Sequence, residues 1–325
     1  MRYVDLAIDY DNIKFKATRD GYGEALLLLG ESIENVVAIG SDISPSVRVD
    51  WFRDKYPDRF ISLGISEQNQ IGVAAGLSLA GKIPYVTNFG LFLSGRGWDQ
   101  IRTTVSYSNL NVKMGGAHGG ISVGPDGATH QALEEIAIMR CIPNMTVIVP
   151  ADYNETKKAA IEVSKLHGPT YIRFGREPFA SITDEATPFE IGKAYCVREG
   201  TDVAFIACGY MVYESLVAAN ILAAEGISAM VVNNHTVKPL DVETIVEAAG
   251  ISGAVVTAEE HQKAGGMGSA VVECLAENYP VPVKMVGVDD RFGESGAFEQ
   301  LKEHYGLNSK YLAEAARNVI KMKLN

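Results

Sequence analysis

The sequence has no apolar run long enough to cross a membrane and no CxxC pair among its four cysteines. A transmembrane helix needs about 20 predominantly apolar residues, so we expect no membrane span. Cysteines this far apart predict neither a disulfide framework nor a zinc site, and we interpret them as buried thiols in a reducing compartment. The first residues carry acids and no apolar core of signal-peptide length. We therefore expect a cytoplasmic protein.

Basic residues are outnumbered, with 29 Lys and Arg against 40 Asp and Glu and a formal net charge of −11. A chain this acidic repels polyanions, so we expect neither nucleic acid nor an anionic membrane as a partner. An anionic substrate would need a local group of cations. The sequence also has no internal repeat. Its hydrophobic content of 47% is ample for buried sheets.

Short β-branched runs alternate with helical patterns along the chain. This alternation predicts parallel sheets with right-handed crossovers. A length of 325 residues exceeds one average core, and a polar segment at 183–192 separates two periodic regions. We therefore predict an α/β fold of two consecutive domains, residues 1–185 and 186–325, each a mainly parallel sheet flanked by helices.

The periodicity predicts the individual elements as follows. In the first region the strands are 36–40, 83–87, 111–116, 145–150 and 170–174, and the helices are 67–80, 96–108, 131–141 and 154–167. In the second region the strands are 202–208, 227–233, 253–259 and 281–288, and the helices are 213–224, 241–249, 267–278 and 297–303.

Three motifs carry residue types suited to chemistry. GISEQNQ puts Glu67 at a helix start, NFGLF supplies Phe89 and Phe92, and VGPDGATHQ puts Asp126 and His130 in a loop rich in glycine and proline. Ligands of parallel sheets collect beyond the carboxyl ends of the strands. A carboxylate, an aromatic platform and imidazoles in one cleft predict a site for a flat heterocyclic cofactor and a small polar substrate.

Each of these residues also has an ordinary structural explanation. A glutamate at a helix start is favoured by the helix dipole. Two phenylalanines at i and i+3 commonly pack in a core, and a lone loop histidine is more often structural than catalytic. Asp42, in SDIS, is a fair turn or helix cap. The residue types alone leave these alternatives open.

The motifs together resemble the thiamine-diphosphate family that contains transketolase and 1-deoxyxylulose-5-phosphate synthase. GSDISPS, GISEQN, NFGLFLSGRGWDQIR, GPDGATHQ and GPTYIRFGR resemble its pyrimidine-binding domain, and EEHQKAGGMGS resembles its C-terminal domain. The resemblance covers essentially the whole chain, and the combination of motifs is highly specific although each alone is weak.

One part of the family pattern is missing. Its members also carry a domain that binds the diphosphate through Mg²⁺ with a GDG…N signature, and the nearest triplet here is the PDG of another motif. The resemblance therefore implies the C-terminal section of a split transketolase. Thiamine diphosphate would be its cofactor, and a separate N-terminal chain would hold Mg²⁺ or another divalent cation, in an α2β2 assembly. We expect no metal ligand in this chain.

The resemblance also implies roles for residues near the cofactor. Glu67 would bind N1′ of the aminopyrimidine and favour the imino tautomer that activates the cofactor. Phe92 would stack on the pyrimidine, and Phe89 would support it or simply pack in the core. Asp42 matches a position near the thiazolium ring.

A second group of residues would contact the substrate. The resemblance assigns His130 to the C1 hydroxyl and the developing alkoxide, His118 to a hydroxyl or phosphate, and Asp126 to a hydroxyl near the carbonyl. Arg173 either points into the fold or joins the pocket. The family's phosphate contacts match Arg19, Ser46 and Arg176.

The implied activity is transfer of a two-carbon ketol unit between ketose and aldose phosphates through the cofactor ylide. One alternative is a subunit of another thiamine-diphosphate enzyme, of the 1-deoxyxylulose-5-phosphate synthase type or the 2-oxoacid dehydrogenase β type. Another is a non-catalytic scaffold subunit. Glu67, Asp126 and His130 argue against a scaffold, which has no need of them.

Overall fold

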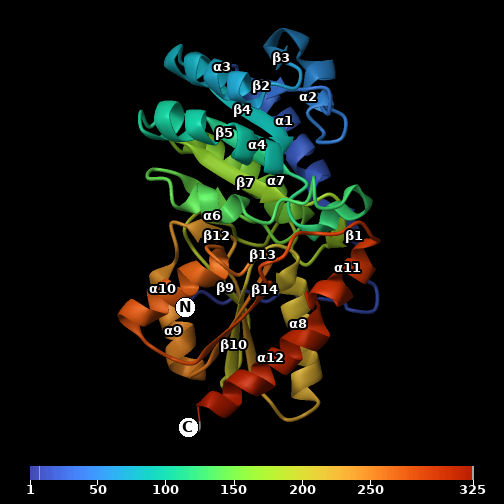
Figure 1. Cartoon of the computed structure of the whole chain (residues 1–325), viewed down its shortest axis with the longest axis vertical. Helices are drawn as coiled ribbons and strands as arrows, with labels where there is room; N and C mark the ends of the chain where they lie inside the picture. The colour runs from blue at the N-terminus through green and yellow to red at the C-terminus, as the bar shows by residue number, and fades with distance from the viewer. Residues whose placement is uncertain (7, 324–325) are drawn as a thin grey trace.

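The computed structural model describes residues 1–6 and 8–323, and it contains two α/β units stacked along the long axis of the molecule (Figure 1). This arrangement confirms the predicted fold class. The elements of the first unit are β1 (Phe15–Ala17), α1 (Thr18–Ser32), β2 (Val36–Gly40), α2 (Asp50–Lys55), η1 (Pro57–Arg59), β3 (Phe60–Ser62), α3 (Glu67–Leu79), β4 (Ile83–Phe89), α4 (Gly90–Arg96), α5 (Trp98–Gln100), the π-helix η2 (Ile101–Ser106), β5 (Lys113–Ala117), η3 (Ile121–Asp126), α6 (Glu135–Arg140), β6 (Thr146–Ile148), α7 (Tyr153–Glu162), η4 (Val163–Lys165), β7 (Thr170–Phe174) and β8 (Pro178–Ala180).

The second unit begins after the polar segment. Its elements are β9 (Tyr195–Arg198), β10 (Val203–Ala207), α8 (Met211–Ala223), β11 (Ala229–Asn233), β12 (Thr236–Lys238), α9 (Val242–Ser252), β13 (Val255–Gln262), α10 (Met267–Asn278), β14 (Val283–Val288), α11 (Phe298–Tyr305) and α12 (Ser309–Met322). Strand β7 and helix α10 have the predicted bounds, whereas α12 was not predicted.

The first sheet has the order β12-β6-β7-β5-β4-β2-β3, and every pair except β12–β6 is parallel. Strands β2, β5 and β7 are buried along their whole length. Burial on both faces explains their continuous apolar runs. Helices α1 and α7 share a core with one face of the sheet, and α3, α4 and α6 share a core with the other.

The second sheet has the order β14-β13-β10-β11-β9, with only β9 antiparallel. Its core on one face contains Leu216 of α8 and Leu312 of α12. On the other face Ile245 of α9 and Val271 of α10 pack into the large core that also extends into the first unit. The two units therefore share part of one apolar core.

Two predicted helices differ from those observed. The helix predicted at 96–108 is divided into α4, α5 and the π-helix, with Gly97 at the junction (φ −87°, ψ 0°). A Cβ on Gly97 would lie 2.7 Å from the carbonyl oxygen of Leu93, so the chain turns tightly there. The helix predicted at 131–141 begins only at α6, because Ala132 forms an isolated bridge with Gly119, in which its carbonyl accepts from Gly120 N at 2.7 Å, and residues 133 and 134 form a bend.

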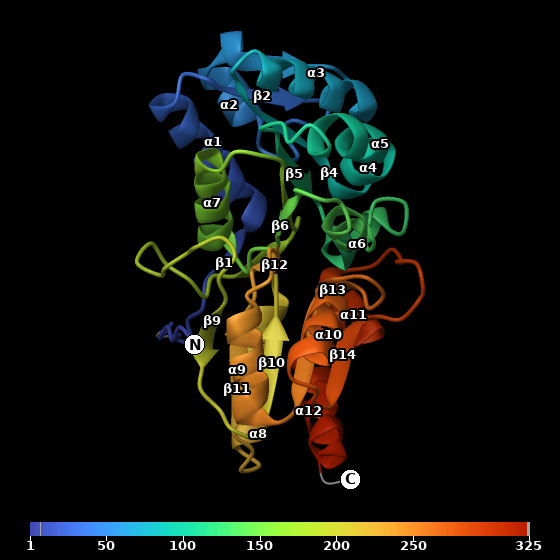
Figure 2. The ribbon, with the colours of Figure 1, turned by 90° about the vertical axis from the view of Figure 1, so that its left-hand side faces the viewer.

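A short segment of each unit pairs with a strand of the other unit. Strand β12, which follows the second sheet's β11, pairs with β6 of the first sheet. The first residues of the chain lie beside β9 of the second unit (Figure 2), where Val4 N donates to the Cys196 carbonyl at 2.9 Å. These contacts tie each unit to the other by backbone hydrogen bonds.

A buried ionic cluster joins the units at the centre of this interface. Arg173 on β7 donates to Glu135 at 2.5 Å, lies 3.4 Å from Glu260 of β13, and donates to the Glu260 carbonyl at 2.6 Å. All three side chains are nearly inaccessible to solvent. Of the two alternatives for Arg173, the structure therefore shows the inward one, and this side chain is a structural connector.

We predict that Arg173→Met strongly destabilises the chain. Removing one partner of a buried ion pair typically costs about 3–5 kcal/mol. The pKa of Glu135 is raised, and that of Glu260 is raised to about 7, because burial outweighs the lowering effect of Arg173 on both. Without Arg173 these carboxyls would hold protons to higher pH, so the stability loss should grow as the pH rises from 5 to 8.

Chemical denaturation at both pH values measures this effect. Arg317→Met is the matched control, because Arg317 pairs with Glu225 at the surface. The control should change the free energy of unfolding far less. A similar small change for Arg173→Met would show that the cluster does not hold the two units together.

Candidate functional site at the carboxyl ends of the first sheet

The residues singled out in the sequence follow the carboxyl ends of strands in the first sheet. Glu67 follows β3, Ser46 follows β2, Phe89 ends β4, His118 follows β5 and Arg176 follows β7. Because β3, β2, β4, β5 and β7 are consecutive in the sheet, these ends form one edge. Arg19 reaches this edge from the first turn of α1.

Arg19, Ser46 and His118 form a contiguous polar group. Arg19 donates to the Ser46 carbonyl at 3.0 Å, and the Ser46 hydroxyl lies 3.3 Å from Nε2 of His118. Within the described residues, Nε of Arg19 and Nδ1 of His118 are buried without a hydrogen-bond partner. Buried polar atoms normally have partners, so this group is prepared for a ligand that supplies them.

His118 is held in an unusual backbone conformation and a cationic environment. Its φ is +59°, and its side chain is 1% exposed. Burial, together with the guanidinium groups of Arg19 and Arg176, lowers the pKa of His118 to about 3. The imidazole is therefore neutral at physiological pH, with one nitrogen able to donate and the other to accept.

The aromatic residues lie between the two histidines. The Phe89 ring centroid is 4.5 Å from that of His118, and the Phe92 centroid is 5.2 Å from that of His130 in an edge-on arrangement. The two phenylalanine rings are 6.2 Å apart. Thr129 lies 3.0 Å from Nδ1 of His130 and restricts that ring. Both histidines therefore border one aromatic surface.

Asp126 and Arg176 pair with each other at the rim. Arg176 Nη1 lies 3.3 Å from Oδ1 of Asp126, and the same nitrogen donates to the Val123 carbonyl at 2.9 Å. The pair is partly exposed. Arg176 is thus already engaged, whereas Arg19 has a backbone carbonyl as its partner and no carboxylate in direct contact among the described residues.

Glu67 is the buried carboxylate of the site. It begins α3 and is 4% exposed, and both of its oxygens contact Nη1 of Arg96, at 3.1 and 3.3 Å. The Arg96 guanidinium also lies over the Phe92 ring, with Cζ 4.1 Å from the ring centroid. Arg96 was not predicted as a site residue, because the helix predicted at 96–108 did not include Phe92, from which Arg96 has an i+4 spacing on the observed α4.

Asp42 is not joined to this cluster by a hydrogen bond in the described part of the chain, and it lies exposed in the turn after β2. A second overlooked residue, Arg48, lies in the same turn with φ +64° and pairs with Asp20 at 2.6 Å. Its charge helps to lower the pKa of His118. The site therefore combines three arginines around one neutral imidazole.

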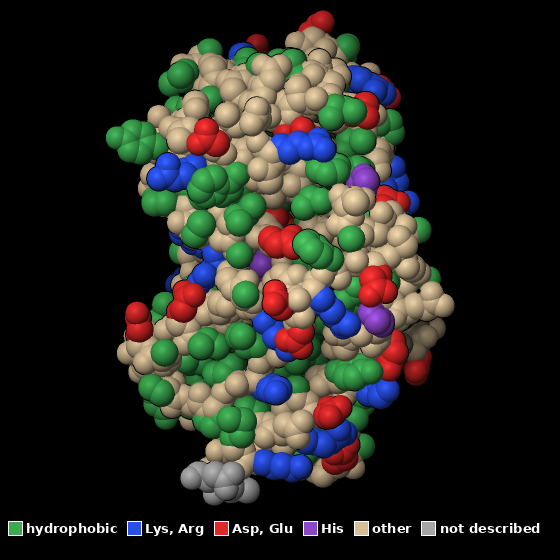
Figure 3. Space-filling model, in the orientation of Figure 1, with side chains coloured by type: hydrophobic (Ala, Val, Ile, Leu, Met, Phe, Trp, Pro, Cys, Tyr) green, Lys and Arg blue, Asp and Glu red, His purple; other side chains and the backbone are tan. Residues whose placement is uncertain are grey.

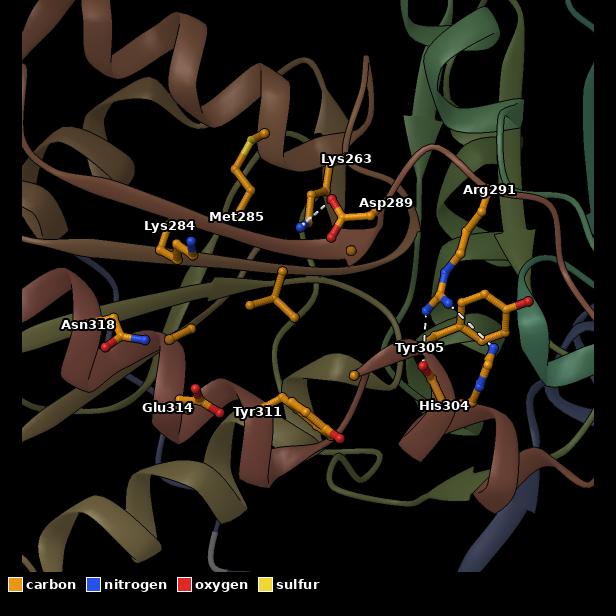
Figure 4. Close-up of a pocket in the computed structure, with 14 residues that line it drawn as sticks. Lys263, Lys284, Met285, Asp289, Arg291, His304, Tyr305, Tyr311, Glu314 and Asn318 are labelled. Atoms are coloured by element: carbon orange, nitrogen blue, oxygen red, sulfur yellow. Dashed lines mark hydrogen bonds and ion pairs between the residues drawn. The ribbon is translucent and has the colours of Figure 1, made fainter.

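A hollow of about 430 Å³ lies elsewhere, between β14 and α12 in the second unit (Figure 4). Two of the cations that line this hollow already have partners, since Lys263 pairs with Asp289 at 2.6 Å and Arg291 donates to the His304 carbonyl at 3.0 Å.

On the face shown in Figure 3, basic and acidic side chains are interspersed over both units. Among the described helices, none is long and apolar enough to cross a membrane.

Comparison with known proteins assigns the chain to a family. Residues 14–180 match the model of the transketolase pyrimidine-binding domain, and residues 192–312 match that of the transketolase C-terminal domain. The chain belongs to the transketolase family. It is therefore a subunit of a thiamine-diphosphate-dependent transketolase, and the two alternatives considered from the sequence are not favoured.

Its relatives include other split transketolases. The 6-deoxy-6-sulfo-D-fructose transketolase subunit SqwH of Clostridium sp. (strain MSTE9) is 45% identical, covering 94% of this chain and 95% of that protein. A putative transketolase C-terminal section of Methanocaldococcus jannaschii is 43% identical, covering 92% and 95%. A solved split-gene transketolase, described as an inactive β4 tetramer, superposes with a TM-score of 0.87 at 42% identity, covering 94% and 99%. The prediction of a split transketolase C-terminal section is confirmed.

The residues at this edge have a chemistry that fits the aminopyrimidine part of thiamine diphosphate. Glu67 is a buried carboxylate, Phe92 offers an aromatic ring beside it, and His118 has a buried nitrogen without a partner in the described chain. No group of three or more His, Cys, Asp or Glu in residues 1–6 and 8–323 is arranged to hold a metal ion.

We predict that His118 stays neutral from pH 8 to pH 5. Its pKa of about 3 results from burial and from neighbouring cations, so protonation should begin only near pH 4. The ¹³C and ¹⁵N imidazole shifts of the isolated chain, assigned with the variant His118→Gln, should be constant over that range. A titration midpoint above pH 5 would contradict the buried, cation-flanked environment.

Proposed function

We propose that this chain is the C-terminal half of a two-chain transketolase that transfers a ketol unit between sugar phosphates. The observation that carries the substrate class is the group formed by Arg19, Ser46 and His118, with Arg176 at its rim. Guanidinium groups bind phosphate oxygens with forked, charge-assisted hydrogen bonds. In a chain of net charge −11, this local group is suited to capture an anionic sugar.

The chain's own residues would divide the chemistry as follows. When bound, thiamine diphosphate supplies a nucleophilic carbon and an electron sink for breaking and forming a carbon–carbon bond beside a ketone. Glu67 would hold the proton at pyrimidine N1′. His130 would donate to the oxygen that gains charge near the reacting carbon, and Asp126 would bind a sugar hydroxyl. Phe92 and Phe89 would exclude water from this side of the site.

The remaining contacts would come from a separate N-terminal chain that holds the diphosphate and its divalent cation. Support comes from helix α3, whose exposed side includes Gly72 and Gly76. A Cβ at either glycine would meet no atom within 4 Å in this chain. Leu79 at the end of the helix is 75% exposed. Such a surface allows close helix packing, and we propose that the partner chain covers it in an α2β2 assembly.

Reconstitution tests the proposed function. The chain alone should be inactive, and mixing with a diphosphate-binding chain, thiamine diphosphate and Mg²⁺ should give ketol transfer. The donor panel should contain fructose 6-phosphate, 6-deoxy-6-sulfofructose and hydroxypyruvate, because one relative is named for the sulfonated sugar. Glu67→Gln should remove turnover in the same assembly. Turnover by the pure chain without a partner would reject the two-chain proposal.

We predict that Arg19→Ala harms phosphorylated donors more than Arg176→Ala does. Arg176 is already paired with Asp126, whereas Arg19 has an unpaired buried nitrogen in the described structure. Loss of a charged hydrogen bond costs about 1.5–3 kcal/mol, so kcat/KM should fall roughly tenfold or more. The comparison is steady-state kinetics with fructose 6-phosphate and with hydroxypyruvate.

The control for this comparison is Arg53→Ala, because Arg53 pairs with Asp54 on the surface of α2. Its kcat/KM should match that of the wild type with both donors. Equal losses with the phosphorylated and unphosphorylated donors in Arg19→Ala would remove Arg19 from the phosphate contacts.

We predict that Gly76→Leu prevents assembly while the chain still folds. The added side chain projects from α3 into open space in the separate chain, so it should cause no internal clash. Gly250→Leu is the matched control, since Gly250 is an exposed glycine on helix α9. Light scattering with the partner chain should show a complex for the control only. A normal complex with Gly76→Leu would place the partner elsewhere.

A further inference from the structure

The Arg96 side chain makes two contacts that the proposed function reserves for the cofactor. Its Nη1 lies between the two oxygens of Glu67, at 3.1 and 3.3 Å, and its Cζ lies 4.1 Å from the centre of the Phe92 ring. These are the carboxylate and the aromatic face that would receive the aminopyrimidine. One guanidinium thus satisfies both groups within the chain itself.

A guanidinium is a reasonable physical substitute for an aminopyrimidine. Both are flat and delocalised, both present N–H donors at an edge, and both can stack on an aromatic ring. Glu67 is 4% exposed, and Arg96 is its hydrogen-bonding side-chain partner in the described residues. A pyrimidine nitrogen would therefore compete with Nη1 of Arg96 for the carboxylate oxygens.

We propose that Arg96 occupies the pyrimidine subsite in the separate chain and leaves it when the cofactor binds in the assembled enzyme. This inference rests on the proposed function. It adds that the chain carries an internal competitor for its own cofactor, which protects Glu67 before assembly.

The surroundings of Arg96 permit this movement. Arg96 is the last residue of α4, its side chain is 51% exposed, and a Cβ on the preceding Gly95 would meet no atom within 4 Å. A hollow of about 470 Å³ adjoins the ion pair, and its lining includes Gln68 and Asn69 of α3. The guanidinium can therefore leave Glu67 without disturbing the core.

The energetics link this movement to cofactor binding. A buried carboxylate without a donor is destabilised, so Arg96 should be in place in most molecules that lack cofactor. Binding then includes the free energy of displacing Arg96. If Arg96 is in place in about nine molecules of ten, the apparent dissociation constant is raised about tenfold.

The test compares cofactor affinity and chain stability. In the assembled enzyme with Mg²⁺, calorimetric titration with thiamine diphosphate should give a dissociation constant roughly tenfold lower for Arg96→Ala than for the wild type. Arg96→Lys, which keeps the charge but not the planar fork, should give a value between them. Arg53→Ala, a half-exposed arginine in another ion pair, should match the wild type.

The separate chain provides an independent readout. Arg96→Ala should lower its unfolding temperature, because Glu67 loses its cation, and the double variant Arg96→Ala, Glu67→Gln should recover most of the loss. An unchanged or higher dissociation constant for Arg96→Ala, in an enzyme that binds cofactor and turns over, would overturn the inference alone. Failure of the assembled wild type to bind cofactor would overturn the proposed function as well.

Discussion

The placement of the site depends on the buried charge of Arg173. This guanidinium is shared by Glu135 of α6 and by the side chain and carbonyl of Glu260 on β13. Glu260 in turn accepts from the backbone N–H of Ser122, in the segment between His118 and His130, at 2.7 Å. A buried charge tolerates few arrangements of its partners, so the cluster fixes both the two sheets and this segment in one geometry.

The glycines of that segment are required by the cluster. A Cβ on Gly119 would lie 2.6 Å from Nε of Arg173, and one on Gly120 would lie 2.1 Å from the Glu260 carboxyl carbon. Gly120 also has φ +78°, which side chains rarely adopt. The backbone can therefore approach the ion pair closely enough to be held by it. His118 immediately precedes these glycines, so their close approach to Arg173 and Glu260 also fixes the position of His118.

Strand and site positions were predictable from the sequence to different extents. Continuous apolar runs gave β7 and β2 correctly, because strands buried on both faces need them. The strand-end rule predicted one cleft for Asp42, His118 and Arg173, together with Glu67 at a helix start. Glu67 and His118 lie at this edge, whereas Asp42 is exposed in the turn after β2 and Arg173 lies within β7 and points into the fold. The direction of Arg173 was not predictable, since its partners are 38 and 87 residues away along the chain. The pairing of β12 with β6 was missed for the same reason, because that contact crosses between the two units.

Several arginines lie close together around His118 in the separate chain. Arg19, Arg48 and Arg176 lower the pKa of His118 together with its burial, and burial and Arg48 lower the pKa of Arg19 itself. Arg48 pairs with Asp20 and Arg176 pairs with Asp126, whereas Nε of Arg19 is buried without a hydrogen-bond partner in the described residues. An anion bound among them would reverse the field at His118 and stabilise the arginines at once. The acidic chain thus gathers three arginines at the edge formed by the strand ends of its first sheet, and an anion bound there would meet favourable charge although the net charge of the chain is −11.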